Sequence, residues 1–303
     1  MHAWFALPDV GADLIERMRL PTAKAVALLP ELQQHDRLRI GPVELERRGD
    51  GGYLTFHNLS CLNAEDDALI DAFETAVDLV LLDERIKVGV LRGGVMDHER
   101  YRGRRVFSAG INLRHLSAGQ ISYLDFLLRR ELGYINKMAH GLSAAGAEAG
   151  AVEKPWIAAV DSFAIGGGAQ ILLVCDRVIA EQGAYFSLPA AKEGIVPGLA
   201  NLRLPRLVGA RMAGQIILDG RRVSSTETDG RLLFDEVVHP AEMDAAIEQA
   251  VERFSAAAVI ANRRMLRLLQ EPAEALRSYF AQFALEQAQR IYSADVLAKV
   301  ARV

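Results

Sequence analysis

The chain has 303 residues, 50% of them hydrophobic and 24% charged, which is ordinary for a globular protein with a sizeable core. Its net charge of −4 and the lack of long runs of like charge exclude nucleic acid as an expected partner. The two cysteines match no zinc-ligand spacing, no apolar stretch approaches ~18 residues, and the N-terminus lacks a signal-peptide pattern. We therefore expect a cytoplasmic protein without a metal site or a membrane partner.

The N-terminal segment is predicted to be helical. Residues 9–34 carry apolar side chains at helical spacing, and the pattern is interrupted near Pro21 and Pro30. We expect this short segment to pack on the main domain or on a neighbouring subunit.

The main sheet is predicted to begin with a hairpin. Residues 43–47 and 53–56 alternate apolar and polar side chains around a glycine pair, which is typical of two strands joined by a turn. An amphipathic helix is expected over residues 63–83, followed by a strand at 88–92. The strand–helix–strand order predicts a crossover unit.

Two glycine-bearing turns follow predicted strands. Residues 156–160 form an apolar strand, Gly166, Gly167 and Gly168 follow it, and residues 169–174 have a helical pattern. Glycines let the backbone approach a ligand, and the first N–H groups of a helix are ready donors. A glycine triplet alone more often marks a plain tight turn. Because a second such turn lies at 107–113, the two can direct two N–H groups at one carbonyl oxygen, as in an oxyanion hole.

The remaining pattern is mainly helical. A helix is expected over 116–141, a surface loop over 143–153 and a strand over 176–180. After Arg206 we predict, in chain order, a helix at 210–219, a strand at 232–238, and helices at 241–254, 257–269 and 273–300.

The two turns, about fifty residues apart, together with Leu188-Pro189 and Pro197-Gly198, resemble the crotonase (enoyl-CoA hydratase/isomerase) superfamily from Val43 to the C-terminus. The resemblance implies an α/β fold with a ββα spiral core at 41–205, preceded by a short helical segment at 1–40. It also implies a helical region at 206–303 that completes the coenzyme A site and builds homotrimers or homohexamers.

Several longer stretches are more specific, namely CLNAEDD (61–67), RRVFSAGINL (104–113), RREL (129–132), FAIGGGAQ (163–170), YFSLPAAKEGIVPG (185–198) and ANRRML (261–266). They resemble one branch of this superfamily, the cofactor-independent dioxygenases that convert 3,5-dihydroxyphenylacetyl-CoA and O₂ to 3,5-dihydroxyphenylglyoxylate and CoA. The two catalytic glutamates of the hydratases correspond to Gln170 and Ala190, which cannot act as acid and base, so hydration is not expected.

The resemblance assigns roles to individual residues. It implies that the N–H groups of Ile111 and Gly167 hold the thioester oxygen, that Gln170 orients a peroxy or thioester oxygen, and that Glu65 and Arg130 recognise the ring hydroxyls. Without the resemblance, Glu65 is equally well explained by its place in the acidic first turn of a helix. Arg130 is more often a residue that pairs with a carboxylate or extends to solvent.

Leu113, Ala190 and Ile195 correspond to a dry pocket for dioxygen, although core packing is the default role of such side chains. Glu193 matches neither hydratase glutamate and is expected to be structural. The implied partners are an acyl-CoA substrate and O₂; coenzyme A is part of the substrate, and no cofactor is expected.

Two alternatives remain open from the sequence. One is a different thioester reaction on the same fold, such as hydrolysis, decarboxylation or isomerisation, with Glu65 or Glu193 as the base. The other is a non-catalytic scaffold or RNA-binding protein of this fold, which the missing glutamates permit. The two glycine turns and the lack of a basic patch weigh against the second alternative.

Overall fold

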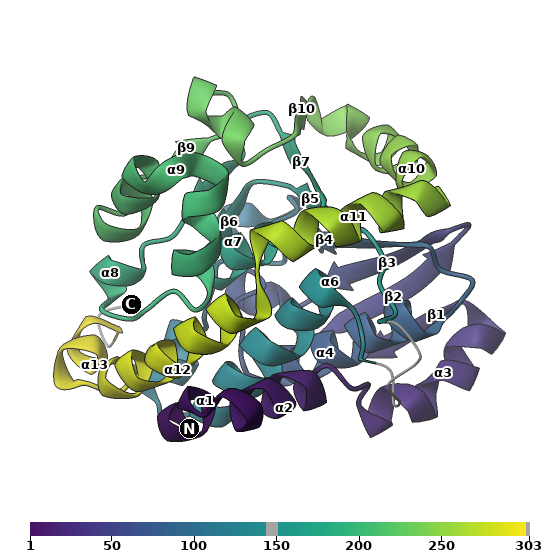
Figure 1. Cartoon of the computed structure of the whole chain (residues 1–303). Helices are drawn as coiled ribbons and strands as arrows, with labels where there is room; N and C mark the ends of the chain where they lie inside the picture. The colour runs from purple at the N-terminus through teal and green to yellow at the C-terminus, as the bar shows by residue number, and fades with distance from the viewer. Residues whose placement is uncertain (144–150, 301–303) are drawn as a thin grey trace.

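The structure is a computed structural model that describes residues 1–143 and 151–300 (Figure 1). Within these residues, seven strands form one sheet, in the spatial order β1 (Arg37–Ile40), β2 (Val43–Arg48), β3 (Gly51–Phe56), β4 (Val88–Gly93), β5 (Trp156–Val160), β7 (Arg177–Glu181) and β10 (Glu236–Val238). A second sheet in the same ranges has three strands, β6 (Phe163–Ile165), β8 (Tyr185–Ser187) and β9 (Val223–Ser224).

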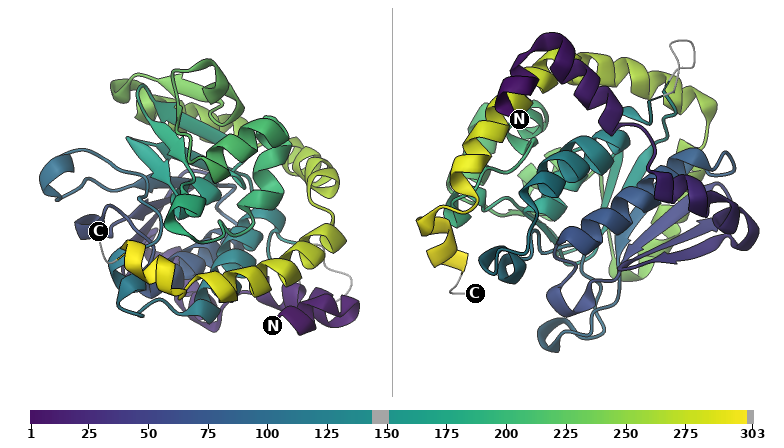
Figure 2. Two further views of the ribbon diagram at one scale, coloured as in Figure 1. Left: turned by 90° about the vertical axis from the view of Figure 1, so that its left-hand side faces the viewer. Right: turned by 90° about the horizontal axis from the view of Figure 1, so that it is seen from below.

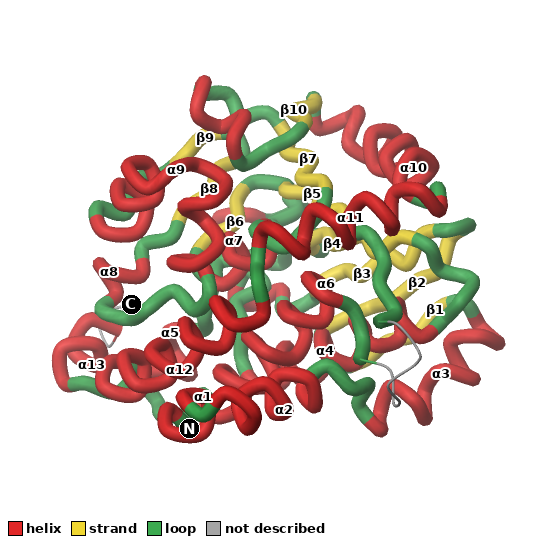
Figure 3. The backbone as a smooth tube through the Cα atoms, in the orientation of Figure 1, coloured by secondary structure: helices red, strands yellow, loops and turns green. Residues whose placement is uncertain are grey.

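Helices enclose the sheets on several sides (Figure 3). The α-helices are α1 (His2–Ala6), α2 (Pro8–Met18), α3 (Ala23–His35), α4 (Asp67–Leu82), α5 (Leu113–Ser117), α6 (Asn136–His140), α7 (Gly167–Leu172), α8 (Ala190–Glu193), α9 (Ala200–Leu218), α10 (Met243–Phe254), α11 (Ala257–Gln270), α12 (Ala273–Arg290) and α13 (Ala294–Val300). The other helical segments are the π-helical η3 (Asp125–Ile135) and the short 3₁₀ turns η1 (Leu59–Cys61), η2 (Glu99–Tyr101), η4 (Thr228–Leu232) and η5 (Pro240–Glu242). None of the helices in the described ranges has both the length and the apolar character needed to cross a membrane.

The large sheet confirms the predicted hairpin and crossover unit. Strands β1, β2 and β3 are antiparallel, whereas β3, β4, β5, β7 and β10 run parallel. Helix α4 connects the parallel neighbours β3 and β4, in which Leu54 lies opposite Leu91. Since the carboxyl ends of parallel strands meet at one edge, the loops after β4 and β5 are brought together there.

Both faces of the parallel strands β4 and β5 are buried. Successive side chains of a strand point to opposite faces, so Val90 and Leu91 of β4 enter different hydrophobic clusters. Val90 and Ile157 pack in a cluster with Ile247 of α10, and Leu91 belongs to the main cluster with residues of α4 and α7. Coverage on both faces is typical of parallel sheets and explains the nearly continuous apolar sequence of β5.

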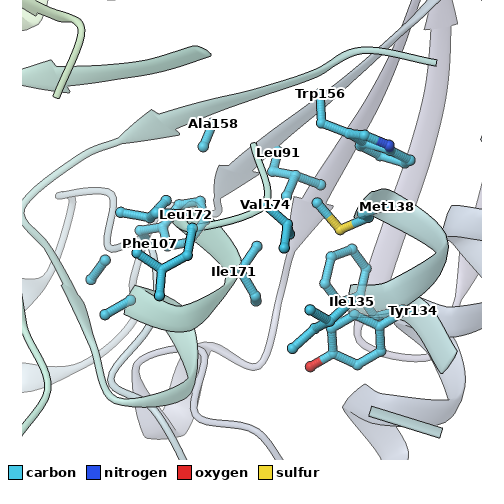
Figure 4. Packing of buried hydrophobic residues seen from close by; sticks show 14 of the residues in the cluster. Leu91, Phe107, Tyr134, Ile135, Met138, Trp156, Ala158, Ile171, Leu172 and Val174 are labelled. Carbon is cyan, nitrogen blue, oxygen red and sulfur yellow. The ribbon is translucent and has the colours of Figure 1, made fainter. Parts of the chain in front are cut away.

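The main cluster supports helix α7. Figure 4 shows Phe107 beside Leu172, with Ile171 and Val174 also directed into the cluster. These four side chains are at most 4% exposed. The glycine turn before α7 and the turn that follows Phe107 are therefore anchored to the same packed core.

The N-terminal helices α1 and α2 lie along helix α12 (Figure 2). Phe5 and Phe280 form an edge-to-face pair with ring centroids 4.7 Å apart. The Nδ1 atom of His2 lies 2.8 Å from the carbonyl oxygen of Ala281. The predicted N-terminal helical segment is confirmed, and residues 37–40 after it already form the edge strand of the large sheet.

The predicted interruption at Pro21 is confirmed, but the one at Pro30 is wrong. Helix α3 continues through Pro30 to His35. A proline inside a helix removes one backbone hydrogen bond and usually disfavours the helix. The burial of Ala25 and Leu32 of α3 in the main core keeps the helix continuous in this case.

Several other boundaries differ from the predictions. The single helix predicted over 116–141 is divided into α5, η3 and α6, and Gly133 has non-helical dihedral angles (φ −81°, ψ −111°). Of the strand predicted over 232–238 only β10 forms, because Leu233 and Phe234 are buried in the main core after a 3₁₀ turn. Helix α9 begins ten residues before the predicted position 210. Most of the loop predicted over 143–153 falls on 144–150, outside the described residues.

Candidate active site

The two predicted glycine turns lie against each other. Ser108 forms a parallel bridge with Ala164, in which Ile165 N donates to Ser108 O at 3.0 Å. Gly110 has a φ angle of +90°, which favours glycine, and a Cβ atom there would lie 3.3 Å from Gly167 N. The turn at 107–113 therefore packs directly on the first residue of α7.

The local backbone leaves two N–H groups free at this contact. Glu65 N donates to Gly110 O at 2.6 Å, and Asn112 N donates to Glu65 O at 2.8 Å. The N–H group of Ile111, which lies between these two residues, takes no part in these hydrogen bonds. Gly167 is the first residue of α7, where N–H groups have no partner within the helix. Across residues 1–143 and 151–300, neither Ile111 N nor Gly167 N donates a hydrogen bond to a protein acceptor.

A small cavity of about 20 Å³ adjoins these two residues, a volume sufficient for about one water molecule. Its walls include the side chains of the predicted site residues Glu65, Gln170, Ala190 and Ile195. They also include Phe126 and Glu193. An aryl group is much larger than this space, so its binding requires the surrounding side chains to move.

A buried group of charged and polar side chains supports the cavity wall. Arg130 Nε donates to Glu65 Oε2 at 3.0 Å, and Arg130 Nη1 donates to Glu131 Oε1 at 2.5 Å and to Gln170 Oε1 at 3.0 Å. Tyr134 Oη donates to Glu65 Oε1 at 2.5 Å. Arg130, Glu131 and Tyr134 are fully buried. Arg130 thus holds Glu65 and Gln170 in place from behind the cavity.

One part of Arg130 is not used in this network. Its Nη2 atom lies 2.9 Å from Glu65 Oε2, but without hydrogen-bond geometry, and it has no other acceptor among the described residues. The guanidinium carbon lies 5.1 Å from the centroid of the Phe126 ring, which itself lines the cavity. Arg130 therefore retains an unsatisfied donor next to the cavity wall.

Burial and the neighbouring charges together set the protonation of this network. Burial disfavours the charge of Arg130, but the combined effect of Glu65, Tyr134 and Glu131 outweighs it and raises the pKa of the guanidinium. Burial also raises the pKa of Tyr134 well above its ordinary value. At neutral pH, Arg130 is consequently a cation and Tyr134 a neutral hydrogen-bond donor.

Glu193 has a different environment from Glu65. It is the last residue of α8 and lines the cavity without an ion-pair or hydrogen-bond partner for its carboxylate among the described residues. Burial raises its pKa from 4.5 to about 7. The cavity is thus bordered by one carboxylate that is fully engaged and one that is free.

The structure brings most of the predicted site residues together. Glu65, Ile111, Gly167, Gln170, Ala190 and Ile195 line the cavity, and Arg130 lies one layer behind it. Leu113 does not line the cavity and packs against the main core as the first residue of α5.

Sequence reasoning missed Glu131 and Tyr134. Tyr134 follows Arg130 by four residues, the spacing of one helical face, but a tyrosine in an apolar helical pattern is more typical of a core residue. The described residues contain no group of three or more His, Cys, Asp or Glu side chains placed to hold a metal ion.

Comparison with known proteins agrees with this geometry. The sequence profile of enoyl-CoA hydratase/isomerase matches residues 52–294. The (3,5-dihydroxyphenyl)acetyl-CoA 1,2-dioxygenase of Amycolatopsis orientalis is 57% identical over 294 residues, which cover 97% of this chain and 68% of that protein. The carnitinyl-CoA dehydratase of Salmonella paratyphi A is 32% identical over 193 residues, covering 62% of this chain and 66% of that protein.

Solved structures share the fold. An enoyl-CoA hydratase/isomerase from Xanthobacter autotrophicus Py2 superimposes with a TM-score of 0.72 at 23% identity, covering 87% of this chain and 94% of that chain. The predicted crotonase-type α/β fold is thereby confirmed. The extent of the profile match shows that the chain belongs to the enoyl-CoA hydratase/isomerase family, the crotonase superfamily.

Proposed function

We propose that this chain is a cofactor-independent dioxygenase that converts 3,5-dihydroxyphenylacetyl-CoA and O₂ to 3,5-dihydroxyphenylglyoxylate and CoA. The observation that carries the proposal is the 57% identity, over 97% of the chain, to a relative named for 1,2-dioxygenation of this thioester. The geometry around Ile111 and Gly167 supports it chemically.

The first chemical step is enolate formation. The N–H groups of Ile111 and Gly167 are free and adjacent, and two such donors stabilise the negative oxygen that a thioester carbonyl acquires when its α-carbon loses a proton. The resorcinol ring delocalises the charge further. The resulting carbanion is electron-rich enough to transfer an electron to O₂ and recombine with it as a peroxide.

The atoms of the overall reaction balance without an external reductant. The peroxide attacks the thioester carbonyl and expels the CoA sulfur, and the O–O bond then breaks as the second α-hydrogen leaves as a proton. Both oxygen atoms of O₂ remain in the glyoxylate, and one of the two protons lost from the methylene group neutralises the CoA thiolate. The reaction therefore needs no redox cofactor.

The polar network supports recognition of the dihydroxylated ring. We infer that Glu65 accepts a hydrogen bond from a ring hydroxyl and that the unsatisfied Nη2 of Arg130 donates to a phenol oxygen once side chains move to admit the ring. Gln170 is oriented by Arg130 Nη1 and lines the cavity, where its amide can contact a peroxy or thioester oxygen. Ala190 and Ile195 would border the dioxygen site, and Leu113 would contribute only after a rearrangement.

The family resemblance also supports assembly into a homotrimer or homohexamer. Helix α11 exposes apolar side chains that a subunit interface would cover, namely Met265, Leu266, Leu268 and Leu269, which are 60% to 83% exposed. Light scattering of the purified protein would establish the number of subunits.

The activity is tested by oxygen uptake with 3,5-dihydroxyphenylacetyl-CoA in the presence of a metal chelator. Release of free CoA thiol is followed in the same reaction. Uptake matched one to one by thiol release is the expected result. Thiol release without uptake would indicate a thioester hydrolase instead, and the absence of both would overturn the proposal for this substrate.

A further inference from the structure

We propose that Glu193 is the catalytic base that removes the α-proton of the bound thioester and later returns that proton to the departing CoA sulfur. This inference rests on the proposed function, because it assigns the proton transfers of that reaction. It revises the structural role that the sequence position of Glu193 suggests.

The position of Glu193 is the first argument. Glu193 borders the same small cavity as Ile111 and Gly167, whose N–H groups would hold the thioester oxygen. The α-carbon is bonded to the carbonyl carbon and must lie next to that oxygen. Glu193 and these two N–H groups therefore border one space, so the movement of side chains that admits the thioester would bring its α-carbon beside Glu193.

The other carboxylate on the cavity wall is already engaged. Both oxygens of Glu65 accept hydrogen bonds, Oε2 from Arg130 and Oε1 from Tyr134. Glu65 is therefore already committed to binding Arg130 and Tyr134, whereas the carboxylate of Glu193 has no such partner among the described residues.

The surroundings of Glu193 favour proton transfer near neutral pH. Its pKa of about 7 arises from burial, and a base is most effective when its pKa lies near the working pH. Charged side chains do occur on the elements packed around α8, namely Arg203, Arg206 and Arg211 of α9, Arg290 of α12, and Asp295 and Lys299 of α13. In the part of the chain that the structure describes, Arg290 is engaged by Gly194 O and Asp295, Arg203 by Glu271, and none forms an ion pair with Glu193.

The proton transfers balance. The carboxylate of Glu193 takes the proton, and the electron pair of the C–H bond becomes the enolate, with its charge on the oxygen held by Ile111 and Gly167. After O₂ has added and the peroxide has attacked the carbonyl, the C–S bond breaks and the thiolate accepts the proton from Glu193. The carboxylate that this step regenerates can then take the second α-proton as the O–O bond breaks.

The test compares wild type with Glu193→Gln, Glu193→Asp and the control Glu286→Gln, which makes the same chemical change on the exposed face of α12. Two rates are measured with 3,5-dihydroxyphenylacetyl-CoA, namely oxygen uptake and anaerobic exchange of the α-protons in D₂O followed by NMR. Substrate binding is measured by calorimetry. We expect Glu193→Gln to lower both rates about 100-fold or more without loss of binding, because that is the usual contribution of a general base.

The pH dependence separates catalysis from structure. In wild type, kcat/KM should fall as the pH drops below about 7, because Glu193 becomes protonated, and Glu193→Gln should lose this dependence. Glu193→Asp should recover part of the rate, and Glu286→Gln should behave as wild type. Near-normal rates in Glu193→Gln would overturn the inference. So would a fall in the kcat/KM of this variant below about pH 7 like that of wild type.

The outcomes distinguish this inference from the proposed function. If wild type exchanges the α-protons but takes up no oxygen, the dioxygenase proposal fails, and loss of exchange in Glu193→Gln still supports the base. If wild type takes up oxygen and Glu193→Gln does so equally well, the function stands and the base assignment fails. If the α-protons of the thioester exchange only when oxygen is present, the rate of oxygen uptake by Glu193→Gln is compared with that of wild type instead. An equal rate would mean that the base assignment fails.

Discussion

Tyr134 donates a hydrogen bond of 2.5 Å to Glu65, which connects the π-helical segment η3 to the loop that precedes α4. Glu65 is also bound by Arg130, one turn earlier in the same segment. The segment therefore fixes both oxygens of a carboxylate that borders the cavity. This arrangement supports the cavity wall by hydrogen bonds and explains why charged groups are tolerated in the interior.

Replacing Arg130 with alanine is expected to lower the free energy of unfolding by about 3–5 kcal/mol, because Glu65 and Glu131 would remain buried without their cation. Urea denaturation followed by circular dichroism measures this loss. The matched control is Arg37→Ala, which breaks the exposed pair with Glu44 and should cost at most about 1 kcal/mol. Equal losses in the two variants would show that the buried network contributes little.

Arg130→Lys tests recognition of the ring. Lysine keeps the charge but lacks the planar fork that donates to Glu65, Glu131 and Gln170 together. Turnover of 3,5-dihydroxyphenylacetyl-CoA should fall more than any residual reaction of phenylacetyl-CoA, measured as thiol release. Parallel losses with both thioesters would remove Arg130 from phenol recognition and leave it a structural role.

Gly167→Ala is expected to lower oxygen uptake by about 100-fold or more, the usual effect of losing one oxyanion donor. A Cβ atom at Gly167 would collide with the carboxylate of Glu65, so either the N–H group or Glu65 must shift. The control is Gly214→Ala on α9, where an added Cβ meets no atom within 4 Å. Helix propensity makes that control neutral or stabilising by up to about 1 kcal/mol. Normal uptake by Gly167→Ala would contradict the assigned oxyanion site.

The sequence predicts the elements around this site well because they are encoded locally. The glycine turns, the fully apolar β5 and the helix α4 each follow from the order of their own residues, and all three are confirmed, although α4 is buried on nearly all sides and not on one face only. The adjacency of Ile111 and Gly167 is also predictable, because parallel strands place their following loops at one edge of the sheet.

Other features depend on tertiary packing. The pattern of apolar residues does not distinguish Tyr134, which packs in the core and also binds Glu65, from an ordinary core aromatic. Leu233 and Phe234 resemble a strand in sequence but are buried by a 3₁₀ turn. The sequence neighbours of Glu193 do not predict that its carboxylate lacks an ion-pair or hydrogen-bond partner among the described residues. Whether it has one depends on which side chains from distant parts of the chain lie close to it.

Ala190→Leu tests the dioxygen pocket. The cavity that Ala190 borders is only about 20 Å³, so a larger side chain would fill it. We expect the rate of oxygen uptake at a fixed low oxygen concentration to fall at least about tenfold, equivalent to about 1.4 kcal/mol in activation free energy. Calorimetry should show a smaller loss in binding of the thioester than in the rate of oxygen uptake. The control is Ala191→Leu at the adjacent exposed position. Weaker thioester binding in Ala190→Leu that matches its loss of rate would argue against a separate oxygen site.

The raised pKa of Glu193 also predicts how stability depends on pH. A carboxyl group with a pKa near 4.5 in the unfolded chain and about 7 in the folded protein binds more protons when folded between these values. The folded state should therefore lose stability as the pH rises through this window, by up to about 3 kcal/mol above pH 7. Glu193→Gln cannot ionise, so it should be more stable than wild type at pH 8 and nearly equal to it at pH 4.5.

Chemical denaturation of wild type, Glu193→Gln and Glu286→Gln at the two pH values measures this difference. Glu286 is exposed, so its substitution should give no pH-dependent gain. A gain for Glu193→Gln that is the same at pH 4.5 and pH 8 would mean that the carboxylate is not destabilised by burial. The expected result is a gain in the free energy of unfolding of Glu193→Gln at pH 8 only, together with loss of α-proton exchange. It would mean that the protein keeps a destabilising carboxylate at the position where the chemistry requires a base. Such a cost in stability is typical of functional sites.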